Sequence, residues 1–267
     1  MNAAGRESDN ETRLVLEGSY TPGDYFEGPV SLRGAGYTLT IDDGSIVATI
    51  DLPDPHVGQA LRPEIEQAIG RVFDAQQVMT CRPHERTRLG MTRHHPDGRK
   101  DVWVLAESII AITSVHPIDF RVTNAEGQIT CDSRAERLDA RRQFREQCVR
   151  HAGDPTLSKL LASLTRSVDD PPNALVHLYE VRDALKDHFD GEQEARPRLG
   201  ITRADWSYLG KISNDEPVRE GRHRGLHCEL RPASEDELER ARSIARQMIR
   251  AYTDHLDRSN PGAETTE

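Results

Sequence analysis

The amino-acid sequence predicts an α+β protein, in which a β-rich N-terminal sheet domain with one helix precedes a C-terminal α-helical bundle. In the first half, short runs of alternating apolar and polar residues are separated by Gly, Asp and Pro, which is typical of antiparallel strands and turns. From about Ser133 the apolar residues recur at helical spacing. We therefore expect an α+β domain at 12–132, a helical bundle at 133–257, and flexible tails at 1–11 and 258–267.

Turn signals place the strands of the first half. The pair Asp43-Gly44 lies between two alternating runs, which is the strongest short signal for a hairpin. The apolar spacing of 62–77 predicts a helix, and Pro63 suits its first turn. The expected strands are 12–20, 28–33, the two halves of 37–52, a second hairpin pairing 78–92 with 100–114, and a third pairing 120–123 with 128–131.

The second half contains a series of amphipathic segments with recognisable helix starts. Thr202 with Asp205, and Ser234 with Glu237, have the spacing of a capping box. The polar stretch 190–198 is predicted to be a loop. Helices are expected at 134–151, 156–167 and 169–189, from 202 onward, and from 234 to about 258.

Composition restricts the class of protein. The 35 basic and 45 acidic residues give a net charge of −10, which argues against nonspecific coating of nucleic acid. No run of 18 apolar residues is present, so we expect no membrane partner. The four cysteines form no CxxC pair and the N-terminus lacks a signal-peptide pattern, which favours the cytoplasm. Arginine outnumbers lysine by 31 to 4. This bias is explained either by the codon composition of a GC-rich genome or by a role of some arginines in phosphate binding.

The most unusual segment is 214–231, which lies just before the last predicted helix. His223 and His227 lie close in sequence to three arginines, namely Arg219, Arg222 and Arg224, of which Arg219 and Arg224 are expected to contact RNA. Imidazoles transfer protons near neutral pH, and guanidinium groups bind phosphate, so this combination is typical of a site that acts on phosphate esters. Glu180 and Asp183 lie on the predicted helix 169–189. They are either paired surface charges or groups that orient a functional arginine.

The hexapeptide that begins at Arg222 and ends at His227 fits the R-x4-6-H motif of HEPN domains. From about Pro171 the chain resembles these proteins, which are helical bundles, often dimeric, found among toxins, abortive-infection proteins and CRISPR-associated nucleases that act in phage defence. The resemblance implies metal-independent RNA cleavage, with Arg222 stabilising the phosphate, His227 acting as general acid or base, and His223 assisting. It also implies a homodimer formed through the bundle.

A second basic segment follows the predicted helix of the first half. Over 82–101 it carries six basic and three acidic residues, a balance of +3. On a strand, alternate side chains share a face. This face is interpreted either as an RNA-binding track or as a charged edge that prevents aggregation. The residues expected on it are Arg82, His84, Arg86 and Arg88.

Two other hypotheses are compatible with the sequence beside RNA cleavage. The first is a zinc site, for which Cys81, His84, His94 and His95 give a loose match, but we expect neither a metal nor another cofactor. The second is a non-enzymatic module, in which the bundle dimerises and the N-terminal sheet recognises a partner or ligand. This reading predicts that Arg222 forms ion pairs with local acids.

Overall fold

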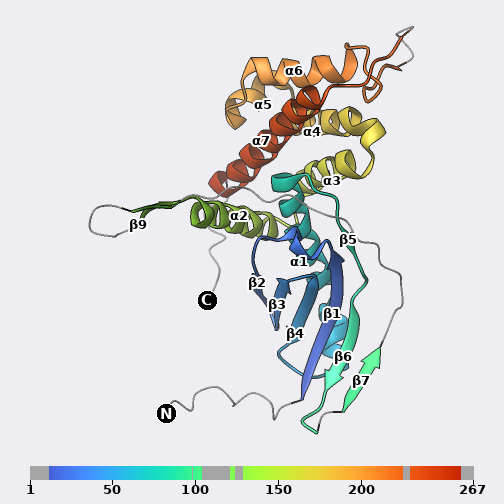
Figure 1. The fold of residues 1–267 in the computed structure, drawn as a ribbon, viewed down its shortest axis with the longest axis vertical. Coiled ribbons are helices and arrows are strands. Elements are labelled where there is room, and N and C mark those ends of the chain that lie inside the picture. The colour runs from blue at the N-terminus through green and yellow to red at the C-terminus, as the bar shows by residue number, and fades with distance from the viewer. Residues whose placement is uncertain (1–11, 98, 104–120, 124–128, 225–228, 260–267) are drawn as a thin grey trace. The chain divides into compact units, whose positions relative to one another are not determined.

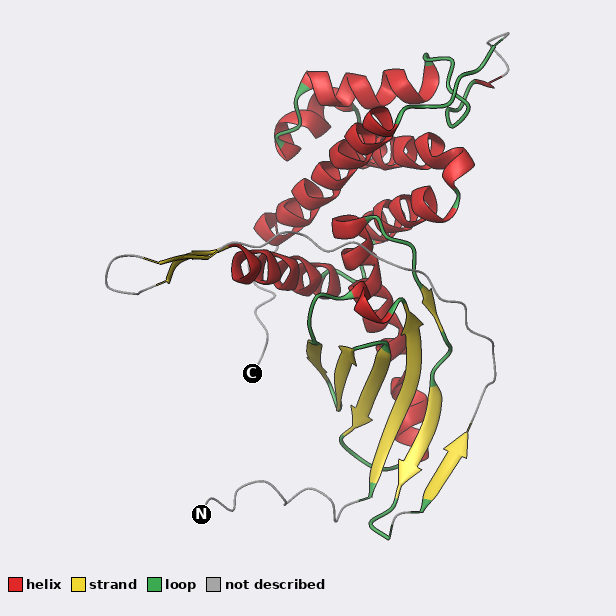
Figure 2. Ribbon diagram, in the orientation of Figure 1, coloured by secondary structure: helices red, strands yellow, loops and turns green. Residues whose placement is uncertain are grey.

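The computed structural model describes residues 12–97, 99–103, 121–123, 129–224 and 229–259. It confirms the α+β class, with strands in the N-terminal half followed mainly by helices (Figures 1 and 2). The chain divides into two compact units. The sheet unit comprises 1–69 and 84–139, and the helical unit comprises 70–83 and 140–267. The helical unit therefore includes one segment from the first half of the sequence.

The sheet unit contains an antiparallel sheet in the order β2-β3-β4-β1-β6-β7, with β5 paired to one end of β1. The expected Asp43-Gly44 hairpin is confirmed, because φ is 41° at Asp43 and 77° at Gly44, the positive values that a type I′ turn requires. The strands are β1 (Arg13–Thr21), β2 (Val30–Gly34), β3 (Tyr37–Asp42), β4 (Ser45–Ile50), β5 (Glu85–Arg86), β6 (Gly90–His94) and β7 (Lys100–Trp103).

One face of this sheet is apolar and packs against the first part of α1 (Pro55–Thr80). Gly58 of α1 lies directly over Leu14 and Met91 of the sheet. Removing these side chains from water supplies the main stabilisation of the unit. Other fully buried side chains on the strands are Leu16, Leu39, Ile41, Ile46 and Ala48.

The predicted start of this helix at 62–63 is wrong, since α1 begins at Pro55 and contains Pro63 in its interior. Asp54 and Pro55 form the actual start, because the Asp54 carboxylate accepts the His56 backbone N–H at 2.9 Å and proline suits the first helical position. The helix continues to Thr80, so the predicted strand at 78–92 is also wrong over its first residues.

The second predicted hairpin is therefore shorter than expected. It pairs β6 with β7, joining His94 to Lys100 and Met91 to Trp103, while residues 104–114 lie outside the described residues. The third predicted hairpin is confirmed by the pairing of β8 (Arg121–Thr123) with β9 (Ile129–Asp132).

The helical unit is built around one hydrophobic core to which all its helices contribute. Its members include Leu178 and Leu185 of α4 and Trp206 of α6, all fully buried. Over the described ranges, every helix is too short or too polar to cross a membrane. The helices are α2 (Ser133–Arg150), α3 (Pro155–Asp169), α4 (Ala174–His188), α5 (Glu192–Leu199), α6 (Arg203–Asn214) and α7 (Glu235–Ser259).

The prediction of a loop at 190–198 is wrong, because this stretch forms α5. Ion pairs from Glu192 to Arg196 and from Glu194 to Arg198 span one turn each, with the acids nearer the N-terminus, as the helix dipole favours. Ala195 and Leu199 are buried and hold the helix on the core. The polar composition of the segment thus reflects an exposed helix surface.

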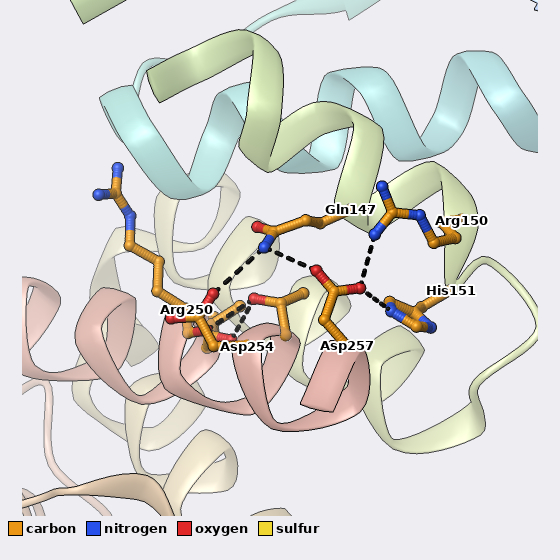
Figure 3. A network of polar contacts seen from close by, with 8 residues as sticks. Gln147, Arg150, His151, Arg250, Asp254 and Asp257 are labelled. Carbon is orange, nitrogen blue, oxygen red and sulfur yellow. Dashed lines mark hydrogen bonds and ion pairs between the residues drawn. The ribbon is translucent and has the colours of Figure 1, made fainter. Parts of the chain in front are cut away.

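A polar network joins the end of α2 to the end of α7 (Figure 3). The Asp257 carboxylate of α7 contacts three residues from the end of α2: Arg150 and His151 at 2.7 Å each, and Gln147 at 2.9 Å. Gln147 also donates to Asp254 at 3.2 Å. Burial alone would raise the pKa of Asp257, but these hydrogen bonds outweigh it and lower the pKa.

Thr202 and Ser234 both cap their helices as predicted, and of the two pairs Ser234 and Glu237 form the reciprocal capping box. The Thr202 hydroxyl accepts the Asp205 N–H at 3.0 Å, and the Ser234 hydroxyl accepts the Glu237 N–H at 3.2 Å. Glu237 returns the contact by accepting the Ser234 N–H at 2.8 Å, and it also binds Arg231 through two 2.7 Å hydrogen bonds. The Arg231 guanidinium lowers the pKa of Glu237 to about 2, with the Ser234 N–H contributing.

We predict that Glu237→Gln lowers the free energy of unfolding at pH 7 by about 1–2 kcal/mol, the range for a lost helix cap. Because the folded-state pKa lies near 2 and the ordinary value is 4.5, this stabilisation is complete above about pH 4.5 and is lost as the pH falls toward 2. Urea unfolding at neutral and acidic pH measures the difference. Glu235→Gln is the matched control, since the Glu235 side chain is 83% exposed. Equal effects of the two variants would contradict the prediction.

Candidate functional site

The basic motif lies in the connection between α6 and α7, residues 217–231, which we term the arginine loop. Its base is closed by backbone contacts. Val218 and Arg231 form a parallel bridge, the Arg219 N–H donates to the Arg231 carbonyl at 3.0 Å, and the Arg231 N–H donates to the Pro217 carbonyl at 3.0 Å. The two ends of the loop are thereby held together, and Val218 is buried in the helical core. Residues 225–228, including the predicted catalytic His227, lie outside the described residues.

The side chain of Arg222, which belongs to the arginine loop, lies against the surface of α4. Its backbone N–H donates to the Ser213 carbonyl at 2.7 Å, at the end of α6. Its guanidinium carbon is 4.5 Å from the ring centroid of Tyr179, and an Nη atom is 3.4 Å from the Asp183 carboxylate. The side chain remains 38% exposed. Arg222 is thus oriented by a ring and a carboxylate one helical turn apart, while its side chain remains partly exposed to solvent.

The other predicted residues of the loop have different environments. His223 is exposed beside Arg222, and both lie in irregular backbone outside any helix. Arg219 is exposed, and its Nε is 3.4 Å from the Leu230 carbonyl. Arg224 donates to the Gly221 and Pro172 carbonyls at 2.9 and 2.8 Å and to the Asn173 side chain at 2.6 Å. Arg224 therefore anchors the loop to the start of α4.

A histidine between two carboxylates lies near this anchor. His177 Nε2 is 3.1 Å from Asp170, and its Nδ1 is 3.5 Å from Glu180. Hydrogen bonds from His177 and Asn173 lower the pKa of Asp170. Glu180 also accepts the Ser163 hydroxyl at 3.1 Å, so it is occupied by α3 and not by an arginine of the loop. Asp183 is the acid that contacts Arg222.

The Tyr179 ring is supported from inside the unit. The Arg182 guanidinium carbon lies 5.1 Å from the ring of Tyr179 and 5.3 Å from the ring of Trp206. Glu192 lies 3.8 Å from the same guanidinium. The Arg182 side chain is only 16% exposed, and it packs over the backbone of Gly210 in α6. These contacts fix the position of the aromatic group on which Arg222 rests.

The second basic segment does not form the predicted strand face. Between Arg82 and Arg88 only Glu85–Arg86 is a strand, and Arg82 belongs to the helical unit, whereas Arg86 and Arg88 belong to the sheet unit and are exposed. His84 packs on the ring of Tyr25, with centroids 4.7 Å apart. Burial, with repulsion from Arg86, lowers the pKa of His84 to about 4, so the imidazole carries no charge near neutral pH.

The candidate zinc ligands are not gathered into a metal site within the described part of the chain. His95 pairs with Asp101 at 2.8 Å and His94 lies 3.7 Å from Glu17, both in the sheet unit, whereas Cys81 belongs to the helical unit. Among the described residues, no three His, Cys, Asp or Glu side chains are grouped as metal ligands.

No family model, curated protein or solved structure matches this chain. The resemblance to HEPN proteins therefore stays a prediction that rests on Arg222, His223 and His227.

The contact between Tyr179 and Arg222 was not predicted from the sequence. The available signal was the pairing of an aromatic and an acidic residue, Tyr179 and Asp183, four positions apart on one helix face. Their partner is 39 residues beyond Asp183, in a loop whose path no local pattern specifies. Arg182 and its contact with Gly210 were missed for the same reason.

We predict that Gly210→Ala destabilises the helical unit by about 1–3 kcal/mol, the usual cost of overpacking. A Cβ at this position would lie 2.8 Å from an Nη atom of Arg182, so the guanidinium, which is only 16% exposed and packed between two rings, would have to shift. Gly70→Ala is the control, because Gly70 is helical and has open space around the position of a Cβ. It should be neutral or slightly stabilising. Thermal unfolding compares the variants, and equal melting temperatures would contradict the assigned packing.

Proposed function

We propose that the helical unit is an HEPN-like module that binds RNA through the arginine loop and cleaves it without a metal ion. The observation that carries the proposal is the placement of Arg222, which is oriented by Tyr179 and Asp183 and remains partly open to solvent. A guanidinium held in this way has N–H groups available for a phosphate and loses little conformational entropy on binding. The adjacent His223 is exposed and supplies an imidazole at the same surface.

The proposed chemistry is attack of a 2′-OH on the adjacent phosphate. The attacking hydroxyl loses a proton and the leaving 5′-oxygen gains one, which His227 would mediate as general acid or base with help from His223. Arg222 would neutralise the charge that develops on the phosphate oxygens. Arg219 and Arg224 would contact RNA, as proposed from the sequence. Arg224 also anchors the loop.

A homodimer and a cytoplasmic location belong to the same proposal. Bundles of the HEPN type combine two copies of the motif, so we propose that the helical unit dimerises. The three described cysteines, Cys81, Cys131 and Cys148, are free thiols, which suits a reducing compartment.

A second candidate is a non-enzymatic interaction module. The ion pair between Arg222 and Asp183 favours it, because a carboxylate beside the guanidinium competes with a phosphate. The anchoring of Arg224 on Asn173 is likewise a structural use of an arginine in the motif. In this candidate the bundle dimerises and the sheet unit binds a partner or ligand, so the protein has no activity on RNA.

The experiment that separates the candidates is incubation of the purified protein with total RNA in the presence of EDTA. The proposal predicts cleavage that leaves 2′,3′-cyclic phosphate ends. Arg222→Ala and His227→Ala should each reduce the rate about 100-fold or more, by analogy with the loss of a transition-state hydrogen-bond donor. End-group analysis of the fragments identifies the chemistry.

Arg198→Ala is the matched control, since Arg198 is 57% exposed on α5 and contacts Glu194 rather than the arginine loop. It should cleave at the wild-type rate. Absence of cleavage by the wild-type protein would contradict the nuclease proposal and favour the non-enzymatic module. Unchanged rates in both Arg222→Ala and His227→Ala would contradict the assignment of these residues as the cleavage site.

A further inference from the structure

Four side chains of the helical unit form an alternating series of rings and guanidinium groups. It begins at Trp206, which is fully buried, and continues through Arg182 to Tyr179 and Arg222. The distances from guanidinium carbon to ring centroid along the series are 5.3, 5.1 and 4.5 Å. Each lies within the range of a cation–π contact. We term this series the aromatic–arginine stack.

The inner end of the stack is fixed. Arg182 is held by Glu192 and pressed against the backbone of Gly210, where an added Cβ would come within 2.8 Å. Trp206 is part of the hydrophobic core. The ring of Tyr179 is therefore a supported surface, not a mobile surface side chain.

The outer end of the stack is Arg222, and it is the exposed end. The backbone of Arg222 is tied to the end of α6 through the Ser213 carbonyl, so its Cα position is fixed while its side chain is 38% exposed. A guanidinium is planar and weakly hydrated, and it stacks readily on aromatic groups. An aromatic group from a ligand would extend the series by one member.

The charges of the stack are already balanced. Arg182 has Glu192 as a partner at 3.8 Å, and Arg222 has Asp183 at 3.4 Å. A phosphate would have to compete with Asp183 for the edge of the Arg222 guanidinium, whereas a flat aromatic group would use its face and leave the ion pair intact. The face of the guanidinium therefore suits a planar, uncharged aromatic group even when its N–H edge contacts Asp183 or a phosphate, and in RNA such a group is an unpaired base.

We propose that Arg222 is a stacking platform for one unpaired nucleobase, and that the helical unit consequently recognises single-stranded RNA. This inference rests on the proposed RNA-binding function and specifies its substrate class. The face of the guanidinium binds the base, while its N–H edge remains directed toward Asp183 or toward a phosphate of the same strand. Bases within a duplex have both faces covered and do not have access to the platform.

The test measures the affinity of the full-length protein for a short fluorescent single-stranded RNA and for the same strand annealed to its complement. The inference predicts binding to the single strand at least about tenfold tighter, since stacking of one base is worth roughly that factor or more. Arg222→Lys keeps the positive charge and removes the plane, so it should weaken single-strand binding by roughly 5- to 30-fold.

Salt dependence separates stacking from phosphate contact. If Arg222 binds a base through its face, Arg222→Gln lowers affinity by the same factor at every salt concentration, whereas the loss of a phosphate contact becomes smaller as the salt concentration rises. Tyr179→Leu should reproduce this loss, whereas Tyr179→Phe should retain the ring and the affinity. Arg198→Lys, on the exposed surface of α5, is the control and should bind as the wild type does.

Equal binding of single and double strands, or wild-type affinity of Arg222→Lys, would overturn the stacking inference and leave the proposed RNA function standing. Failure of the wild-type protein to bind either form of RNA would overturn the proposed function, and the stacking inference with it.

Discussion

The helical unit depends on the burial of one face of α4. Leu178, Val181 and Leu185 of this helix are fully buried in a core to which α3, α6 and α7 also contribute. Burying side chains of this kind contributes about 1.5–3 kcal/mol each, far more than any single surface ion pair. Because one face of α4 is committed to the core, Tyr179 and Asp183 must lie toward its outer surface. The position of the candidate site is therefore a consequence of the core.

The arginine loop is fitted onto that outer surface by several modest contacts. Closure of its base, the anchoring of Arg224 on Asn173, and the Arg231–Glu237 pair at the start of α7 each restrict its path. Ordering a loop costs conformational entropy, so the contacts that order it before a ligand arrives reduce the cost of binding. This preorganisation is the physical basis for assigning a binding role to Arg222, although Asp183 competes for its charge.

Local patterns in the sequence predicted most of the fold. The helix caps at Thr202 and Ser234 and the hairpin at Asp43-Gly44 were predictable because each depends on residues within a few positions of one another. The helix α5 was missed because its sequence, which has many charged residues and only two buried ones, has the composition of a polar loop. In the site, Arg222 was singled out from its neighbours, but its contact with Tyr179 was not, because residues distant in sequence meet only through tertiary packing.

The central claim is that Tyr179 and Arg222 act together as one surface for RNA. A double-mutant cycle on RNA affinity, using Tyr179→Leu and Arg222→Lys singly and combined, measures this coupling directly. If the two residues form one surface, the double variant binds no more weakly than the weaker single variant, with a coupling energy of about 1 kcal/mol or more. Losses that add fully in the double variant would show that the two residues act independently, and this result would contradict the account.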